Sequence, residues 1–420
     1  MKTKLLAFFT ILLTATLAFA GNWPEWRGPA ADGISDEKDP PTAWSATDNI
    51  TWKAPLPGGN STPIVWGEQV FVTAAGEGGH VRSLYCFNRA DGKVMWKDDV
   101  AFDGAEPSHA DNPYCSSSPI TDGKAVYAWL GSAGVIACDL AGKQVWKADI
   151  GAFTHIWGNA GTPVFYKDTL ILNCGPGINC FLIALSKDTG KTVWKTEVPE
   201  ALSKGPGEFK GSWSTPVLAD IGGTPQILVD LPGYVAAFNP DTGAEIWRCT
   251  GLGPLAYANP LVGKDIIVAM SGYGGPSLAL RKPAATDHGD LTASHRLWLI
   301  VEKKKNPQRI GSGVLLGDRI YTMEEPGFAK CIEAATGKEL WHERAAGSTW
   351  ASTEFVDGKL FSTDQSGETV VWKPGDKFEL VSRNPLNEKT RASLAFSDGQ
   401  VFARTYEALY CIGKRKAAGK

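Results

Sequence analysis

A segment with one fixed order of features recurs along the chain, and this repetition restricts the fold more than any other property. The clearest copy starts with Ser214-Thr215-Pro216-Val217, ends with Asp241-Thr242-Gly243-Ala244-Glu245-Ile246-Trp247, and consists of four short runs separated by turn signals. The tryptophans that close six such copies are Trp96, Trp146, Trp194, Trp247, Trp298 and Trp341, spaced by 43 to 53 residues. That period is typical of propeller blades, each made of four antiparallel strands.

Two further copies and one N-terminal strand complete the set. The seventh copy starts near Ser352, with Phe378 in the place of the tryptophan, and the eighth starts at Ser393 but lacks its last strand. The missing strand is found at the other end of the chain, where Ile50-Thr51-Trp52-Lys53 matches the closing strand Val94-Met95-Trp96-Lys97. We therefore expect the N-terminal strand to complete the last blade, which removes exposed sheet edges.

The sequence thus predicts an all-β fold, an eight-bladed β-propeller of four-stranded antiparallel blades over residues 50–413. An extension over residues 21–49 would precede the propeller, and a basic tail over residues 414–420 would follow it. Because a closed propeller satisfies its own sheet edges, we expect a monomer. The repeated tryptophans are expected to be structural and buried where neighbouring blades meet. They are Trp52, Trp96, Trp146, Trp194, Trp247, Trp298 and Trp341.

The N-terminus has the pattern of a secretory signal. Lys2 and Lys4 are followed by an apolar stretch that ends in Ala18-Phe19-Ala20. This pattern predicts cleavage after Ala20 and a periplasmic or extracellular protein. The apolar stretch is shorter than the roughly 20 residues of a membrane-spanning helix. Because the next residue is Gly21 and not a cysteine, we expect no lipid anchor either.

Charge and motifs exclude several classes of function. The chain has 42 Lys and Arg against 45 Asp and Glu, without the clustered basic surplus that phosphate binding needs, so we expect no nucleic-acid partner. The six histidines have no metal-binding spacing, and we predict no metal site. Neither a nucleophile elbow nor a phosphate-binding loop occurs. No catalytic residue can be assigned from a motif.

Five of the eight cysteines fall into two groups. Cys86, Cys331 and Cys411 occupy equivalent positions in separate blades, where other copies have alanine, and this indicates a small buried slot in a strand. Cys174 and Cys180 instead flank a short glycine- and proline-containing segment. A hairpin there would bring the two within the distance that a disulfide needs, so we predict a bridge between them.

The residues expected to face the mouth of the central channel lie just before each inner strand. Counting three residues back from the proline that opens this strand, or from its equivalent, reaches Trp213, Tyr257, Trp350 and Arg391. Nearby positions add His109, Asp111, His155, Trp157, Asn159 and Arg309. Aromatic faces combined with fixed polar groups suit a planar or sugar-like ligand, or a peptide strand. The alternative is that these side chains only fill the channel.

The motif Asp-x-Thr-Gly-Lys-x-x-x-Trp, preceded by an inner strand that begins Ser/Thr-Thr-Pro, resembles the pyrroloquinoline-quinone-like propeller repeat. That repeat is shared by quinoprotein dehydrogenases and by the propeller lipoprotein of the outer-membrane assembly complex. The opening Trp23-Pro24-Glu25-Trp26-Arg27-Gly28-Pro29 is similar to the mature start of many secreted bacterial repeat proteins. In the dehydrogenases the quinone stacks between a tryptophan and a disulfide of adjacent cysteines, beside a calcium ion. This chain has no adjacent pair of cysteines.

Two functional hypotheses follow from the residues and the resemblance. The first is a secreted, non-catalytic propeller without a cofactor, which binds a protein or glycan ligand or scaffolds an envelope assembly. The alternative is a dehydrogenase of alcohols or sugars that holds pyrroloquinoline quinone (PQQ) and calcium near Trp213, Trp350 and Arg391. The absence of a catalytic motif favours the first hypothesis.

Overall fold

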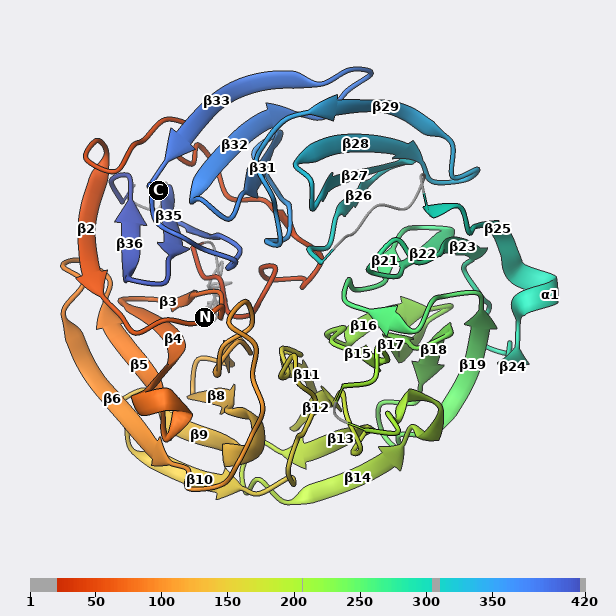
Figure 1. Ribbon diagram of the computed structural model, residues 1–420, viewed down its shortest axis with the longest axis horizontal. Helices are drawn as coiled ribbons and strands as arrows, with labels where there is room; N and C mark the ends of the chain where they lie inside the picture. The colour runs from red at the N-terminus through yellow and green to blue at the C-terminus, as the bar shows by residue number, and fades with distance from the viewer. Residues whose placement is uncertain (1–20, 206, 304–309, 416–420) are drawn as a thin grey trace, which may run out of the picture.

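A ring of β-sheets around one central axis makes up the molecule (Figure 1). The computed structural model describes residues 21–205, 207–303 and 310–415, so the predicted signal and most of the basic tail lie outside the described residues. Eight of its sheets have four antiparallel blade strands each, and the predicted eight-bladed all-β propeller is confirmed. Five inner strands begin directly after a proline of the repeat, where the missing N–H costs no ladder hydrogen bond.

The first four blades follow each other along the chain, each running from the axis to the rim. Blade 1 contains β3 (Ile64–Trp66), β4 (Gln69–Gly76), β5 (Val81–Asn88) and β6 (Val94–Ala101). Blade 2 contains β7 (Ile120–Thr121), β8 (Ala125–Trp129), β9 (Val135–Asp139) and β10 (Gln144–Ala148). Blade 3 contains β11 (Val164–Tyr166), β12 (Thr169–Cys174), β13 (Phe181–Ser186) and β14 (Thr192–Glu197). Blade 4 contains β16 (Val217–Ile221), β17 (Thr224–Leu231), β18 (Tyr234–Phe238) and β19 (Glu245–Thr250).

The remaining blades close the circle. Blade 5 contains β21 (Leu261–Val262), β22 (Ile266–Met270), β23 (Ser277–Arg281) and β25 (Arg296–Ile300). Blade 6 contains β26 (Val314–Leu316), β27 (Arg319–Glu324), β28 (Phe328–Glu333) and β29 (Glu339–Arg344). Blade 7 contains β30 (Glu354–Val356), β31 (Lys359–Thr363), β32 (Glu368–Lys373) and β33 (Glu379–Pro385). Blade 8 contains β34 (Ala395–Ser397), β35 (Gln400–Arg404), β36 (Ala408–Ile412) and the N-terminal β2 (Ile50–Pro55).

The pairing of β2 with β36 closes the propeller as the sequence predicts. The two strands are antiparallel, with Trp52 opposite Cys411, so the outermost strand of blade 8 comes from the other end of the chain. This arrangement ties both ends of the propeller into one sheet. Blade 8 thereby has the same four strands as the other blades, and the sheet edges that remain in a propeller are short and lie at the rim.

A few short elements lie outside this pattern. β15 (Gly211–Ser212) and β20 (Leu255–Ala256) pair in parallel, and β24 (Gly289–Asp290) adds to the rim of blade 4. The helical segments are η1 (Glu77–Gly79), η2 (Gly131–Ala133), η3 (Pro199–Ala201) and α1 (Thr292–His295). Within the described residues, no helix has the length and apolar character needed to cross a membrane.

The predicted N-terminal extension crosses one end of the central channel and contacts the inner strands of several blades. Trp23 exchanges two backbone hydrogen bonds of 2.9 Å with Val65 of β3. Further along, Arg27 donates to the backbone oxygens of Ser312 and Gly313 at 3.1 and 2.6 Å. The extension then pairs through β1 (Ile34–Ser35) with β30 in parallel. It therefore links blade 1 with blades 6 and 7.

The rim tryptophans lie between neighbouring blades. In six of the seven, the indole N–H donates to a backbone oxygen in the outer turn of the next blade, at 2.6 to 3.0 Å. Trp194, for example, donates to Pro240 at 2.9 Å and packs on the turn of Gly243. Trp247 is the exception: it donates to Gln226 within its own blade, and the next blade carries the inserted segment with β24 and α1.

The strand register explains the small residues opposite these tryptophans. Trp96, Trp341 and Trp52 face Cys86, Cys331 and Cys411 across the sheet, while the other four face alanines. The predicted small buried slot for these cysteines is therefore correct. Blade 7 differs from the sequence expectation, because the register places Ser382, and not Phe378, at the tryptophan position. Phe378 precedes β33 and packs on Trp372 instead.

Candidate functional site

A closed ring of hydrogen bonds surrounds the channel axis. The residue that precedes each inner-strand proline, or its equivalent, donates its backbone N–H to the side-chain oxygen of the same position in the next blade, at 2.8 to 3.3 Å. The members of this axial ring are Thr62, Ser118, Thr162, Thr215, Asn259, Ser312, Ser352 and Ser393. The eighth bond, from Ser393 to Thr62, closes the circle. Each blade is thereby positioned at the axis by both of its neighbours.

A second circle of side chains forms the wall of a cavity, and each of them precedes an axial-ring residue by two positions in the sequence. This mouth ring consists of Asn60, Ser116, Ala160, Trp213, Tyr257, Ile310, Trp350 and Arg391, and all eight line a cavity of about 350 Å³. Six members of the axial ring line the same cavity. Counting three residues back from the inner-strand proline, or its equivalent, thus reaches a cavity-lining position in every blade. Four of these positions were not named in the sequence analysis, namely Asn60, Ser116, Ala160 and Ile310.

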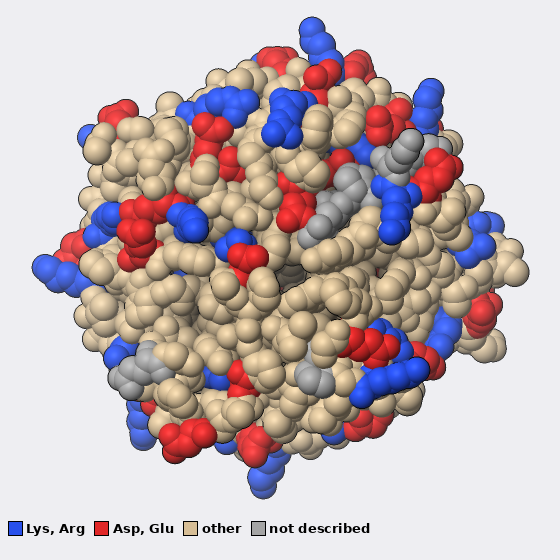
Figure 2. All heavy atoms as spheres, viewed as in Figure 1, with Lys and Arg blue, Asp and Glu red and all other residues tan. Residues whose placement is uncertain are grey.

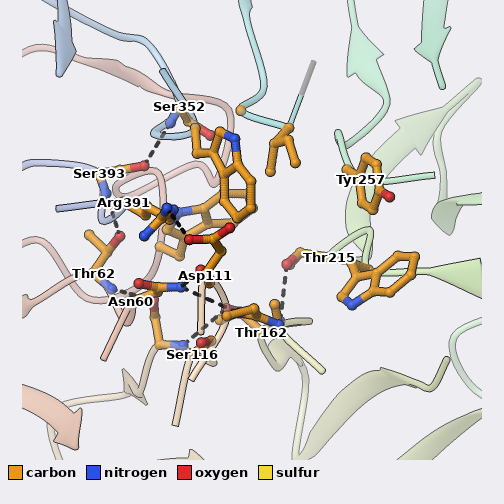
Figure 3. Close-up of a pocket in the computed structure, with 18 of the residues that line it drawn as sticks. Asn60, Thr62, Asp111, Ser116, Thr162, Thr215, Tyr257, Ser352, Arg391 and Ser393 are labelled. Carbon is orange, nitrogen blue, oxygen red and sulfur yellow. Dashed lines mark hydrogen bonds and ion pairs between the residues drawn. The ribbon is translucent and has the colours of Figure 1, made fainter. Parts of the chain in front are cut away.

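The cavity opens where the surface of the molecule is hollowed near its centre (Figure 2). Most atoms around this hollow are uncharged, and one basic and acidic pair lies beside it. In the close-up, Arg391 and Asp111 point toward each other on one side of the cavity, and Tyr257 lies across the open space from them (Figure 3). The cavity therefore has a polar side and an aromatic side.

The polar side is organised by Arg391. Its guanidinium pairs with the Asp111 carboxylate and donates to the Tyr406 hydroxyl at 2.6 Å and to Gln365 at 3.1 Å. The same guanidinium lies 4.6 Å from the ring centroid of Trp350, a cation–π contact that holds the indole in place. Asp111 and Arg391 come from opposite ends of the sequence, and the closure of the propeller brings them together.

A second carboxylate lies beside this pair. Glu325 follows β27 and accepts a 2.8 Å hydrogen bond from the Trp350 indole. Burial raises the pKa of Glu325, while the Trp350 hydrogen bond and the Arg391 charge oppose that shift. Burial likewise raises the pKa of the Tyr406 hydroxyl. The polar side thus presents one cation that is already paired and a second carboxyl group, Glu325, that is hydrogen-bonded to Trp350.

The aromatic side is a packed cluster of five rings. Trp157 and Tyr273 stack at 5.4 Å between centroids, and Trp213 lies 4.9 Å from Tyr257. Phe209 meets the Trp157 ring edge-on at 4.9 Å. Trp157, Trp213, Tyr257 and Tyr273 line the cavity, and burial raises the pKa of the Tyr257 hydroxyl. The cluster forms a continuous aromatic wall, in which each ring contacts its neighbours.

Two residues expected at the mouth lie behind this wall. His155 is 2% exposed, packs edge-on against Trp213 at 5.1 Å and donates through Nε2 to the Glu208 carbonyl at 2.9 Å. Burial lowers its pKa, and its Nδ1 accepts the Trp157 N–H at 3.2 Å. Asn159 is also buried and contacts Glu106 at 3.4 Å. His155 thus supports the wall, and neither residue lines the cavity. Arg309 lies outside the described residues.

The other expected residues lie at the cavity itself. His109 and Asp111 share one loop before blade 2, where the Asp111 N–H donates to His109 Nδ1 at 3.2 Å. Tyr273, Glu325 and Trp26 also line the cavity and were missed by the sequence reasoning. Tyr273 and Glu325 lie between the second and third strands of their blades, so no count from the inner-strand proline reaches them. Trp26 belongs to the N-terminal extension, whose path the repeat does not determine.

The predicted disulfide between Cys174 and Cys180 is wrong. Both are buried free thiols. The hairpin register pairs Cys174 with Phe181, so Cys180 precedes the paired position and its side chain lies on the other face of the sheet. Cys174 packs in the core toward blade 2, whereas Cys180 packs in the core toward blade 4 with its thiol near the Ala201 carbonyl. The alternation of side chains along a strand separates the two sulfurs.

In the part of the chain that the structure describes, no group of three or more His, Cys, Asp or Glu side chains is placed to hold a metal ion. Asp111 and Glu325 are the two carboxylates at the cavity, and the first is engaged by Arg391. Oxygen ligands for a hard cation such as calcium must converge from several residues.

The fold is similar to solved structures of two kinds. BamB from Moraxella catarrhalis matches with a TM-score of 0.61 at 15% identity, over 86% of this chain and 96% of that one. Quinohemoprotein alcohol dehydrogenase from Comamonas testosteroni matches with a TM-score of 0.66 at 15% identity, over 97% of this chain and 83% of that one. At such identities these likenesses show the shared propeller fold.

A curated relative and a family pattern extend the comparison. Tetrathionate hydrolase from Acidithiobacillus ferrooxidans is 23% identical over 252 residues, which are 52% of this chain and 47% of that protein. The chain thus spans about half the length of this relative. The sequence pattern of the family described as outer membrane protein assembly factor BamB matches residues 34–174, 231–349 and 325–413. Since these segments cover well over half of the chain, the protein belongs to this family of propellers with pyrroloquinoline-quinone-like repeats.

Proposed function

We propose that the protein is a secreted, non-catalytic propeller of the periplasm or cell surface that holds a protein or glycan ligand at the mouth of its channel. The observation that carries this proposal is the two-sided cavity of about 350 Å³, with a packed aromatic wall opposite the Arg391–Asp111 pair. Pockets of this size and composition bind small organic groups, such as a sugar or one side chain of a protein partner.

The alternative, a PQQ- and calcium-dependent dehydrogenase, suits the cavity less well. The quinone is a flat tricarboxylate, and its carboxylates need cationic partners. Among the described residues, Arg391 is the only Lys or Arg that lines the cavity, and its guanidinium is already paired with Asp111. With Glu325 beside them, the lining groups have no positive surplus. Without an adjacent pair of cysteines, the second stacking surface for the quinone is missing as well.

The proposal is tested by measuring ligand capture at the mouth. The purified protein and its Trp213→Ala and Trp350→Ala variants would be applied to a glycan array and to a displayed peptide library. Arg344→Ala, a surface change outside the cavity, serves as the matched control. We expect specific ligands whose binding falls at least tenfold in the mouth variants and is unchanged in the control, because each lost ring removes more than 1.4 kcal/mol of contact. Capture that the mouth variants do not change would refute the proposal.

A titration with PQQ and calcium tests the alternative on the same protein. Under the proposal, neither the absorbance of the quinone nor the thermal stability of the protein changes in a saturable way. Saturable stabilisation that Trp213→Ala and Trp350→Ala abolish would instead favour the dehydrogenase, and a screen of alcohols and sugars with a dye acceptor would follow.

A further inference from the structure

The base of the cavity carries an unusual surplus of hydrogen-bond donors. Each axial-ring hydroxyl accepts one backbone N–H from the preceding blade and keeps its own proton to donate. Among the described residues, Thr62, Ser118, Thr162, Thr215 and Ser352 line the cavity without an acceptor for that proton. The hydroxyls lie around one axis (Figure 3). A ligand at this position must therefore bring several acceptors around its own perimeter.

The charges at the cavity select a neutral ligand. The Arg391 guanidinium is paired with Asp111 and also donates to Tyr406 and Gln365. Glu325 adds a second carboxyl group to the same side. A carboxylate, sulfonate or phosphate group would find no unpaired cation here and would approach two acidic side chains. The donors of the axial ring are therefore suited to uncharged oxygens.

Acceptors for the protons of such a ligand are also present. Asn60 donates through Nδ2 to the Asp111 carbonyl at 3.1 Å, which leaves its buried Oδ1 without a partner. An unsatisfied buried acceptor is costly, so a hydroxyl that donated to it would be stabilised. Glu325 uses Oε1 for the Trp350 indole and lines the cavity with the rest of its carboxyl group. The cavity thus offers donors at its base and acceptors on its polar side.

From this arrangement we propose that the mouth ring and only those axial-ring hydroxyls that line the cavity together bind one neutral pyranose ring, the exposed sugar of a glycan. A pyranose has hydroxyls around its perimeter and two C–H faces, which match a circle of donors combined with aromatic surfaces. Trp26, Trp213 and Tyr257 line the cavity as such surfaces. A peptide backbone presents its carbonyls along a line and would satisfy few of the ring hydroxyls. This inference rests on the proposed function and decides between its protein and glycan branches.

Ser352 and Ser312 provide a matched pair of variants. Each hydroxyl accepts one backbone N–H of the axial ring, at 2.9 and 3.0 Å, and each side chain is 2% exposed. Ser352 lines the cavity, whereas Ser312 does not. Ser352→Ala and Ser312→Ala therefore remove equivalent ring bonds, but only the first removes a donor from the cavity. Equal losses of stability would show that the two changes are comparable.

The experiment is a calorimetric titration of the purified protein with methyl glycosides of glucose, galactose, mannose and N-acetylglucosamine. Methyl glucuronide serves as an anionic probe. We expect at least one neutral glycoside to bind, with an affinity that Ser352→Ala weakens about three- to tenfold, the loss of one hydrogen bond. Ser312→Ala should bind like the unmodified protein.

Each other outcome overturns the inference in its own way. Preference for the glucuronide would contradict the argument from charge. An equal effect of the two serine variants would show that the ring acts only through stability. Mouth-dependent capture of peptides without binding of any glycoside would overturn the pyranose site and leave the proposed function intact. No mouth-dependent ligand of either class would refute both.

Discussion

Five of the rim tryptophans, Trp194 among them, pack on the turn glycine of the next blade, and this contact predicts a large difference between two similar substitutions. At Gly243, with φ +73°, an added Cβ would lie 2.4 Å from Cε3 of Trp194. At Gly358, with φ +74°, an added Cβ would meet nothing within 4 Å. Gly243→Ala and Gly358→Ala therefore impose the same backbone strain, but only the first creates a clash with a neighbouring blade.

The two costs can be separated. A left-handed backbone conformation costs an L-residue about 1 to 2 kcal/mol. Forcing a methyl group into a packed interface costs a further 1 to 3 kcal/mol or so, since Trp194 is buried and held by its bond to the Pro240 carbonyl. We expect the free energy of unfolding to fall by about 1 to 2 kcal/mol in Gly358→Ala and by about 2 to 5 kcal/mol in Gly243→Ala.

Urea unfolding followed by tryptophan fluorescence and circular dichroism measures both values. A double variant, Gly243→Ala with Trp194→Phe, should recover part of the loss, because the smaller ring makes room for the methyl group and the two changes are coupled. Equal losses in the two alanine variants, or strict additivity in the double variant, would refute the idea that this contact holds neighbouring blades together.

Three further predictions concern the core. The carboxyl oxygens of Asp230 have no hydrogen-bond partner, and burial raises its pKa above the unfolded value of about 3.9. The contribution of Asp230 to the free energy of unfolding is therefore fully present below the unfolded pKa and is lost as pH rises through the folded pKa. Asp230→Asn should therefore become more stable relative to the unmodified protein as pH rises, and a pH-independent difference in urea unfolding would contradict this. All eight cysteines are buried free thiols, and burial raises the pKa of Cys86 and Cys115 to about 12. A thiol reagent should react with none of them in the native protein and with all eight in denaturant. Reaction of only six thiols in denaturant would indicate a disulfide and contradict this prediction. Trp23 is fully buried against Phe396, so Trp23→Ala should lower the free energy of unfolding by about 3 to 5 kcal/mol, and a loss under 1 kcal/mol would show that the extension does not stabilise the propeller.

The sequence alone determined the number of blades, the strand that closes the ring and the positions that face the channel. These properties are local and periodic, because a proline opens five of the eight inner strands and the closing tryptophans recur at a spacing of 43 to 53 residues. Counting from the proline therefore identified Trp213, Tyr257, Trp350 and Arg391, and all four line the cavity. Trp52 was recognised as part of the last blade because it repeats the pattern of the other closing strands.

Only the tertiary structure decided how these positions interact. The Arg391–Asp111 pair joins residues 280 positions apart, and it exists because ring closure brings blade 8 next to blade 1 and the loop before blade 2. Tyr273 and Glu325 reach the cavity from loops outside the repeated motif, and His155 is turned behind Trp213 by packing. Cys174 and Cys180 are close in sequence but lie on opposite faces of one sheet. A repeat specifies its own strands, whereas contacts across the axis depend on the curvature of the whole ring.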